Sequence, residues 1–141
     1  MLKNLNPYLN ADLLHVLRSM GHGDELILVD CNFPPDSVAA HTVSGKQIRM
    51  EGLNVPEVAE AILSVYPLDS FVPEPVLRME VVGNPDEWVE CHHEMKKVVD
   101  KTSDREWKFG SIERHAFMNV HEMLMQSYVL EVSEGAMDVL C

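Results

Sequence analysis

A short, unbroken apolar run near the start of the chain, Leu26 to Val29 in the string "LILVD", most constrains what the chain can fold into. Gly23 precedes the run and Pro34 follows it, so residues that break regular structure bound it on both sides. A run with no polar face is typical of a strand covered on both sides. The pattern therefore predicts a central strand that ends at Asp30, inside a layered fold.

Helical and strand-like patterns alternate along the rest of the chain. Apolar residues recur at helical spacing after Asn10 or Asp12, either of which can cap a helix that Gly21 ends. The further expected elements are helices at 55–66, 84–102 and 116–126 and strands at 76–82, 107–112 and 128–132. This alternation favours an α/β fold in which helices sandwich a sheet. Because 141 residues is a usual size for one domain, we expect a single domain over 1–141.

The charge balance excludes several classes of partner. The chain carries 11 basic and 23 acidic residues, for a net charge of −12, so its surface repels nucleic acid backbones and anionic lipids. The first 20 residues alternate polar and apolar positions and do not resemble a signal peptide, and no run is long enough to span a bilayer. These features predict a soluble, cytoplasmic protein that binds neither nucleic acid nor membrane.

The string "MGHGDE", directly before the apolar run, carries the candidate chemistry. Glycines flank His22, so the backbone can turn tightly there and a ligand can approach closely. Imidazole titrates near neutral pH, and a carboxylate such as Asp30 can orient a hydroxyl or fix the imidazole tautomer. His22 and Asp30 are therefore a candidate acid/base pair. The alternative is a helix stop and turn in which His22 is simply exposed.

Distance limits how this pair can work. A strand of about four residues spans roughly 13 Å, which places His22 and Asp30 at opposite ends of the run. The loop could fold back over the sheet, or the site could form between subunits, with the histidine of one chain facing the aspartate of another. The residues themselves leave both arrangements open.

Other chemistries have little support in the sequence. Adjacent residues on a helix point in different directions, so Cys91, His92 and His93 do not converge on one metal ion. The chain contains no P-loop, GxGxxG, HExxH or GxSxG pattern. We therefore expect no metal and no cofactor.

Three stretches resemble the RbsD/FucU sugar mutarotases. The strings are "MLKNLNPYLNADLLHVLRSMGHGDELILVDCNFP", "IRMEGLNVPEVAEAILSVYPLDSFV" and, more weakly, "IERHAF". The resemblance implies an RbsD-like fold and the interconversion of the α and β anomers of L-fucose or a related sugar, by acid/base-assisted ring opening and reclosure without a cofactor. It also implies a ring-like homo-oligomer, commonly a decamer, with sites at subunit boundaries.

The same resemblance implies a role for three residues. His22 matches the family's acid/base histidine, Asp30 its sugar-hydroxyl aspartate, and Arg114 its sugar-binding arginine. Two other functions remain as alternatives: a non-catalytic sugar-binding or regulatory oligomer of the same fold, and an aldose isomerisation that starts from the same opened ring.

Overall fold

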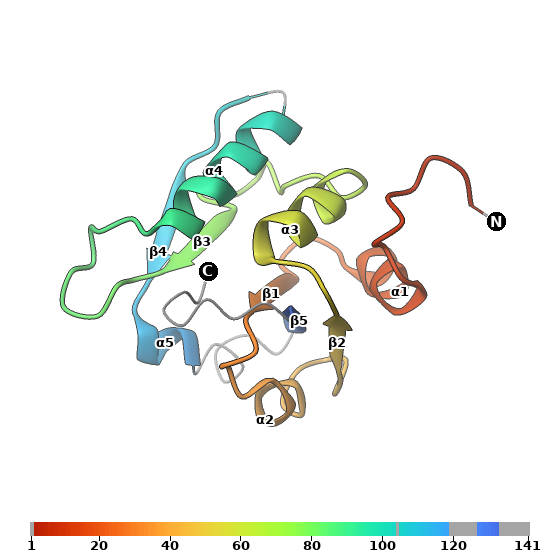
Figure 1. The fold of residues 1–141 in the computed structure, drawn as a ribbon, viewed down its shortest axis with the longest axis horizontal. Coiled ribbons are helices and arrows are strands. Elements are labelled where there is room, and N and C mark those ends of the chain that lie inside the picture. Colours follow the sequence, from red (N-terminus) through yellow and green to blue (C-terminus); the bar gives the residue numbers. More distant parts are fainter. Residues whose placement is uncertain (1, 104, 119–126, 133–141) are drawn as a thin grey trace.

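The computed structural model describes residues 2–103, 105–118 and 127–132. Its helices are α1 (Ala11–Ser19), α2 (Pro35–Ala39), α3 (Val55–Leu63), α4 (Glu90–Thr102) and α5 (Arg114–Met118). Its strands are β1 (Glu25–Val29), β2 (Gln47–Met50), β3 (Val76–Met79), β4 (Phe109–Ile112) and β5 (Ser127–Val132). Helices and strands alternate along the chain, as an α/β fold requires (Figure 1).

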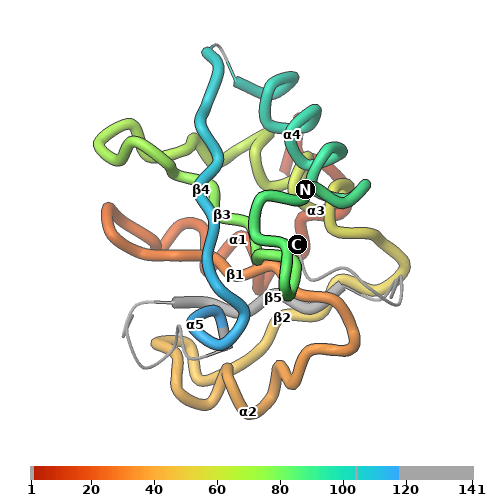
Figure 2. The backbone as a smooth tube through the Cα atoms, turned by 90° about the vertical axis from the view of Figure 1, so that its left-hand side faces the viewer, coloured from red at the N-terminus to blue at the C-terminus, as the bar shows by residue number. Residues whose placement is uncertain are grey.

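The described strands form two parallel sheets. One has the order β1–β5–β2, and the other is the pair β3–β4. In Figure 2, β3 and β4 lie next to each other, and β4 runs from α5 up towards the end of α4. Met79 of β3 and Ile112 of β4 pack against a buried cluster that contains residues of β1, so apolar contacts join the two sheets.

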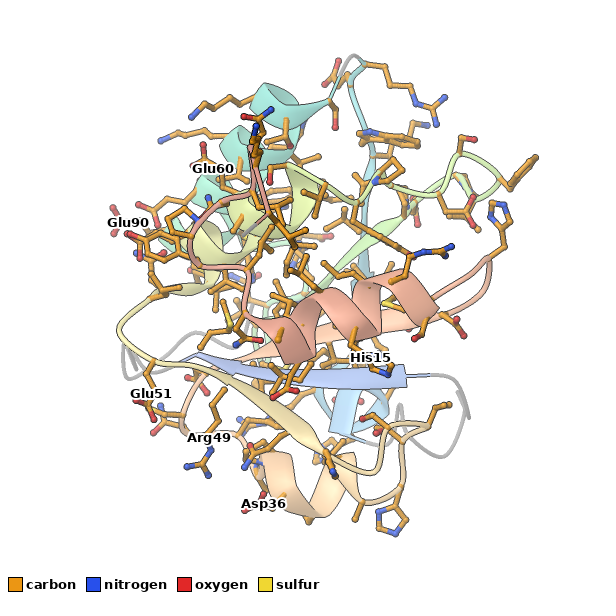
Figure 3. The ribbon with its side chains drawn as sticks, turned by 90° about the vertical axis from the view of Figure 1, so that its right-hand side faces the viewer. His15, Asp36, Arg49, Glu51, Glu60 and Glu90 are labelled. Atoms are coloured by element: carbon orange, nitrogen blue, oxygen red, sulfur yellow. The ribbon has the colours of Figure 1, made fainter. Side chains whose placement is uncertain are left out.

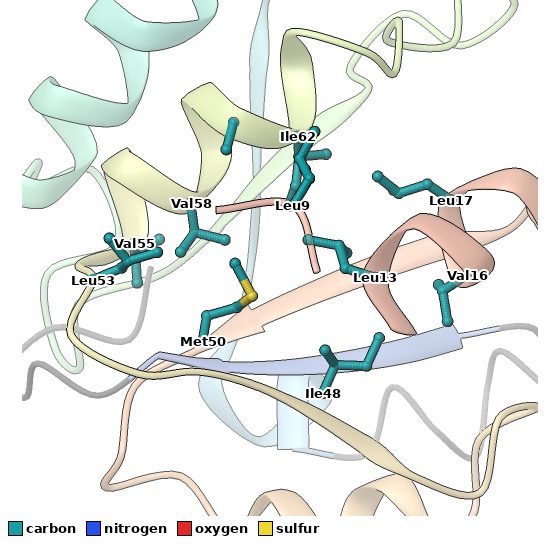
Figure 4. Close-up of a cluster of buried hydrophobic side chains, with 11 residues drawn as sticks. Leu9, Leu13, Val16, Leu17, Ile48, Met50, Leu53, Val55, Val58 and Ile62 are labelled. Atoms are coloured by element: carbon teal, nitrogen blue, oxygen red, sulfur yellow. The ribbon is translucent and has the colours of Figure 1, made fainter. Parts of the chain in front are cut away.

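Two buried apolar clusters hold this arrangement together. The first joins α1, β2 and α3 (Figure 4), and includes Leu13, Val16, Ile48, Met50, Val58 and Ile62. The second joins β1, α2 and α5, and contains Ile27, Val29, Phe33, Val38, Ala39 and Phe117. Leu26 and Leu28 pack against the first cluster, whereas Ile27 and Val29 belong to the second. The expectation that both faces of β1 are covered is confirmed.

The expectation that β1 is the central strand is wrong. In the described part of the sheet, β5 lies between β1 and β2, and Glu25 is the register partner of Ser127. The apolar character of β1 comes from the two clusters above and below it. Burial of a strand's faces does not report how many strands lie beside it, so the apolar run could not locate β1 within the sheet.

Side chains cap the two helices that carry the first cluster. Asn10 Oδ1 accepts the Leu13 N–H at 2.9 Å at the start of α1. Before α3, Asn54 Oδ1 accepts the Glu57 N–H at 2.9 Å, and Glu57 Oε2 accepts the Asn54 N–H at 3.0 Å. Such caps satisfy backbone donors that have no partner within the helix. Of the two residues expected to cap the first helix, Asn10 or Asp12, the structure shows Asn10 in that role.

Other boundaries differ from the expected ones. Helix α4 begins at Glu90 and not near Asn84, because Asn84 closes a turn in which its Nδ2 donates to Glu87 Oε2 at 2.8 Å. The short elements α2 and β2 were not expected. Of the helix expected at 116–126, residues 119–126 lie outside the described residues. Within the described ranges, no helix has the length and apolar character needed to cross a membrane.

Candidate functional site

His22 lies at the tip of a tight loop between α1 and β1. The loop is closed by Asp24, whose Oδ2 accepts the Gly21 N–H at 2.7 Å and whose own N–H donates to the Gly21 carbonyl at 3.2 Å. Gly23 adopts a φ of 87°, a conformation that side chains other than glycine's rarely tolerate. The His22 side chain is 75% exposed. Gly21, through its hydrogen bonds to Asp24, and Gly23, through its positive φ, therefore form a turn in which the imidazole of His22 is exposed to solvent.

A carboxylate from a distant part of the sequence holds this imidazole. Nδ1 of His22 lies 3.0 Å from Oδ2 of Asp69, which belongs to the loop between α3 and β3. The other oxygen, Oδ1, accepts the Phe71 N–H at 2.9 Å. The ring of Phe71 meets that of His22 edge-on, with 4.9 Å between centroids. One carboxylate thus positions both the imidazole and the neighbouring aromatic ring.

The ionised Asp69 carboxylate determines which ring nitrogen of His22 faces it with a proton. The backbone N–H of Phe71, and then His22, lower the pKa of Asp69 from its ordinary value of 3.8. The carboxylate therefore stays ionised at neutral pH and acts as an acceptor, so Nδ1 of His22 carries the proton in this contact. Nε2 is then the ring nitrogen available to a ligand.

Asp30 occupies a different environment at the carboxyl end of β1. It is 3% exposed, and its Oδ1 accepts the Asn32 N–H at 3.0 Å while its Oδ2 accepts from Asn32 Nδ2 at 3.1 Å. The turn continues with the Phe33 N–H donating to the Asp30 carbonyl at 3.3 Å. Each carboxylate oxygen can accept more than one hydrogen bond, so Asp30 keeps acceptor capacity for a ligand hydroxyl.

Arg114 is the first residue of α5 and is exposed. The residue before it, Glu113, accepts the N–H groups of His115 at 2.8 Å and Ala116 at 3.0 Å. These two backbone bonds, that of His115 first, lower the pKa of Glu113 from its ordinary value of 4.5. Glu113 therefore caps the short helix as an anion, and this cap sets the position of Arg114.

The structure brings the segments of Asp30 and Arg114 together and leaves His22 apart from them. Phe33, which follows Asp30, and Phe117, which follows Arg114, pack with 5.8 Å between ring centroids. In contrast, β1 separates His22 from Asp30, and its five residues at about 3.3 Å each span roughly 16 Å. Within one chain, His22 therefore lies at the amino end of β1, whereas Asp30 and the segment that carries Arg114 lie at its carboxyl end.

Two other features lie apart from these groups. A hollow of about 420 Å³ opens beside α1, and its polar lining consists of Asp12, His15, Ser19, Ser44, Lys46 and Gln47. His92 is buried, and its Nδ1 accepts the Val89 N–H at 3.4 Å. Among residues 2–103, 105–118 and 127–132, no three His, Cys, Asp or Glu side chains are arranged to hold a metal ion.

Comparison with known proteins identifies the family. A model of the RbsD / FucU transport protein family matches residues 3–130. The chain belongs to this family. The L-fucose mutarotase of Actinobacillus pleuropneumoniae serotype 5b is 33% identical over 117 residues, which are 83% of this chain and 78% of that protein. The expected membership is thus confirmed.

Mammalian relatives match over a shorter stretch. The fucose mutarotase of Bos taurus is 42% identical over 82 residues, which are 58% of this chain and 52% of that protein. The human fucose mutarotase is 41% identical over 86 residues, or 61% of this chain and 54% of the human protein. The chain spans about half the length of these two curated relatives.

Solved structures confirm the fold. The crystal structure of protein Atu2016 has a TM-score of 0.88 at 40% identity, over 98% of this chain and 90% of that chain. The fucose mutarotase of Streptococcus pneumoniae, solved in complex with L-fucose, has a TM-score of 0.80 at 29% identity, over 96% of this chain and 91% of that chain. The expected RbsD-like α/β fold is therefore correct.

Reasoning from the sequence did not select Asp69 or Phe71 as site residues. Both belong to the string "PLDSF", which contributed to the resemblance but carries no periodicity and no metal or phosphate motif. Asp69 lies 47 positions from His22, and only the fold brings the two together. The available signal was a lone aspartate in a loop that resembles a family segment.

Proposed function

We propose that this chain is a monosaccharide mutarotase that interconverts the α and β anomers of L-fucose or a related sugar. Membership of the RbsD/FucU family and relatives named fucose mutarotase support this function. The observation that carries it is the exposed His22, presented on a glycine-flanked loop and held through Nδ1 by an ionised Asp69. Such a pair leaves Nε2 free to exchange protons with a bound sugar.

The reaction needs proton transfers and the breaking and re-forming of one bond. Ring opening moves one proton away from the anomeric hydroxyl and one onto the ring oxygen while the bond between carbon 1 and the ring oxygen breaks. Closure on the other face of the aldehyde re-forms that bond and reverses both proton transfers. No atom is oxidised or reduced and no group is lost, so the chemistry requires neither metal nor cofactor. Nε2 of His22 gives or takes the proton, while Asp69 keeps the ring orientation and stabilises the imidazolium that forms.

Asp30 and Arg114 are proposed to hold sugar hydroxyls. The Asp30 carboxylate is fixed by Asn32 and can accept a hydrogen bond from a hydroxyl, whereas the exposed guanidinium of Arg114 can donate to one. The packing of Phe33 on Phe117 keeps their two segments together. This group would bind and orient the sugar, and the His22 group would move the protons.

We further propose that a homo-oligomer completes the site. Because β1 separates His22 from Asp30 by roughly 16 Å, His22 of one protomer would act on a sugar held by Asp30 and Arg114 of the partner subunit. A heterologous interface of this kind, repeated around an axis, closes into a ring. Within each protomer, residues 1–141 would act as one domain, because Met79 and Ile112 join the two sheets.

Saturation-transfer NMR on the anomeric protons tests this function directly. The exchange rates of L-fucose, D-ribose and D-galactose would be measured with the wild type, His22→Ala and His15→Ala. His15, labelled in Figure 3, is an exposed histidine on α1 and provides the matched control. We expect faster exchange of at least one sugar, loss of that effect in His22→Ala, and no change in His15→Ala.

Two outcomes would contradict the proposal. Saturable binding of a sugar without faster exchange would select the sugar-binding oligomer instead. Formation of a ketose product would select an aldose isomerase. Circular dichroism of both variants would confirm that a lost rate reflects lost chemistry, since both side chains are exposed.

A further inference from the structure

Phe71 is an unusual neighbour for a group that exchanges protons. It is 81% exposed, more than any other large apolar residue described as exposed in the structure. Its ring lies edge-on to His22 at 4.9 Å between centroids, and its backbone N–H is bound by the same Asp69 carboxylate that holds the imidazole. The ring is therefore placed by the proton-transfer group itself, and its apolar surface is open to a ligand at that group.

We infer that Phe71 is a specificity-determining residue that contacts carbon 6 of the sugar and favours 6-deoxy sugars over their 6-hydroxy counterparts. This inference rests on the proposed function, because it requires a sugar at His22. L-Fucose and L-galactose differ only at this carbon, which is a methyl group in L-fucose and a hydroxymethyl group in L-galactose.

The chemistry of ring opening places carbon 6 close to Phe71. The ring oxygen is bonded to carbon 1 and carbon 5, and carbon 6 is attached to carbon 5. A histidine that protonates the ring oxygen approaches it to hydrogen-bond distance, about 2.6–3.2 Å. Because the ring centroids of His22 and Phe71 are 4.9 Å apart, a substituent on carbon 5 that turns towards Phe71 would reach the phenyl ring.

The surroundings of Phe71 suit a methyl group better than a hydroxyl. The phenyl ring offers a sugar hydroxyl neither a hydrogen-bond donor nor an acceptor, and Phe71 is 81% exposed, which leaves its apolar face open to an incoming ligand. A hydroxyl placed against this wall loses water and gains little in return. An apolar pocket discriminates against a substrate that adds only a hydroxyl by about 10²-fold in kcat/KM, and we expect about tenfold for a single open wall.

The test compares the two sugars in the full-length protein. The ratio of kcat/KM for L-fucose to that for L-galactose would be measured by anomeric exchange NMR in the wild type, Phe71→Ala, Phe71→Leu and Val82→Ala. Val82 is an apolar residue that is 71% exposed on the turn after β3, and it serves as the control. Using the ratio cancels any indirect effect of the variants on His22, because that effect applies to both sugars.

We expect the ratio to fall about tenfold in Phe71→Ala, to persist largely in Phe71→Leu and to be unchanged in Val82→Ala. An unchanged ratio in an active Phe71→Ala protein would overturn the inference and leave the proposed function intact. Equal losses for both sugars together with a smaller mass in light scattering would also overturn it, since Phe71 would then be a contact between copies. A wild type that accelerates neither sugar would defeat the proposed function, and the inference with it.

Discussion

The two ends of β1 differ in nearly every physical property. At the amino end, His22 is exposed on a glycine loop, and its described partners are a carboxylate and an aromatic ring from one other loop. At the carboxyl end, Asp30 is buried, and both of its oxygens accept hydrogen bonds from Asn32. One strand therefore carries an open polar group at one end and a packed, fixed group at the other.

This difference separates two tasks that a sugar site must perform. A group that holds hydroxyls gains from rigidity, because a fixed acceptor loses little freedom on binding. A group that exchanges protons must reach the substrate, and an exposed imidazole with one nitrogen tied to Asp69 can do so. On the proposed function, the fold would divide binding and proton transfer between the two ends of the same strand, and each could be altered without disturbing the other.

The largest expected effect is on the exchange rate. Mixing two inactive variants would test whether each site combines His22 of one protomer with Arg114 of another. His22→Ala alone should lose about 10²- to 10⁴-fold in exchange rate, the usual contribution of general acid/base catalysis. If sites form between protomers, unfolding and reassembling His22→Ala with Arg114→Ala should restore about one quarter of the wild-type rate, because random assembly pairs two intact halves at that frequency. Exchange NMR on the reassembled mixture measures this.

The control for this experiment mixes His22→Ala with His22→Gln, since neither chain carries an imidazole at position 22. No activity should return in that mixture. If the His22→Ala and Arg114→Ala mixture also stays inactive while both proteins reassemble, the site lies within one chain. The loop that carries His22 would then have to move across the roughly 16 Å that separates His22 from Asp30.

Replacing the carboxylate that holds His22 would test whether Asp69 positions the imidazole at the amino end of β1. Asp69→Asn keeps the shape but presents an amide N–H or a weaker acceptor to Nδ1, so the imidazole loses its fixed tautomer. We expect kcat to fall about tenfold to a hundredfold, the worth of a hydrogen bond to a charged group, with KM little changed. A rise in KM at constant kcat would show that Asp69 binds sugar and does not position His22.

Truncating the buried aspartate would test the rigidity of the carboxyl end. Asp30→Ala leaves the N–H and side-chain amide of Asn32 without their acceptor, which should lower the free energy of unfolding by about 1–3 kcal/mol. His22→Ala should change it by less than about 0.5 kcal/mol, because the side chain is exposed. Urea titration measures both. Equal losses from the two variants would contradict the contrast between the ends of β1.

The smallest expected effect is on the free energy of unfolding, on replacement of Glu25, the first residue of β1. Burial raises its pKa above the ordinary 4.5, so the folded state binds the proton more tightly than the unfolded state and ionisation of Glu25 disfavours folding. Glu25→Gln should therefore raise the free energy of unfolding at pH 7 by less than about 0.5 kcal/mol, and the melting temperature slightly with it. The gain should disappear as the pH falls below 4.5, where the carboxyl is protonated in both states.

The matched control is Glu51→Gln, at an exposed glutamate that follows β2 and is labelled in Figure 3. Thermal melts of both variants at pH 7 and pH 4 give the comparison. A Glu25→Gln protein that is less stable than the wild type at pH 7 would show that the carboxylate makes a favourable contact at the start of β1.

Periodicity and capping predicted the elements that build the core. The first helix with its Asn10 cap, the strand from Leu26 and the helix from Val55 all carry an apolar pattern that neighbouring polar residues interrupt clearly. The short β2 was missed because four residues with a mixed pattern are too few to show a period. The late start of α4 reflects a turn closed by Asn84 and Glu87, a contact that helical spacing does not encode.

The candidate site was predictable only where a local pattern existed. The glycines around His22 and the position of Asp30 after an apolar run are visible in the sequence, and Arg114 came from the family resemblance. The partnership of His22 with Asp69 and the packing of Phe33 on Phe117 join distant segments. Such pairings depend on the tertiary path of the chain, so residue patterns within one segment could not reveal them.

The position of β5 between β1 and β2 ties the sheet to the order of synthesis. β1 and β2 are synthesised early, but in the described part of the chain each pairs only with β5 (Ser127–Val132), which is synthesised late. Until then their backbone N–H and C=O groups are unpaired edges that can recruit other chains. Closing the sheet joins residues far apart in sequence, which is slow for parallel strands. We therefore expect the amino-terminal strands of the nascent protein to be prone to aggregation until residues 127–132 have been synthesised.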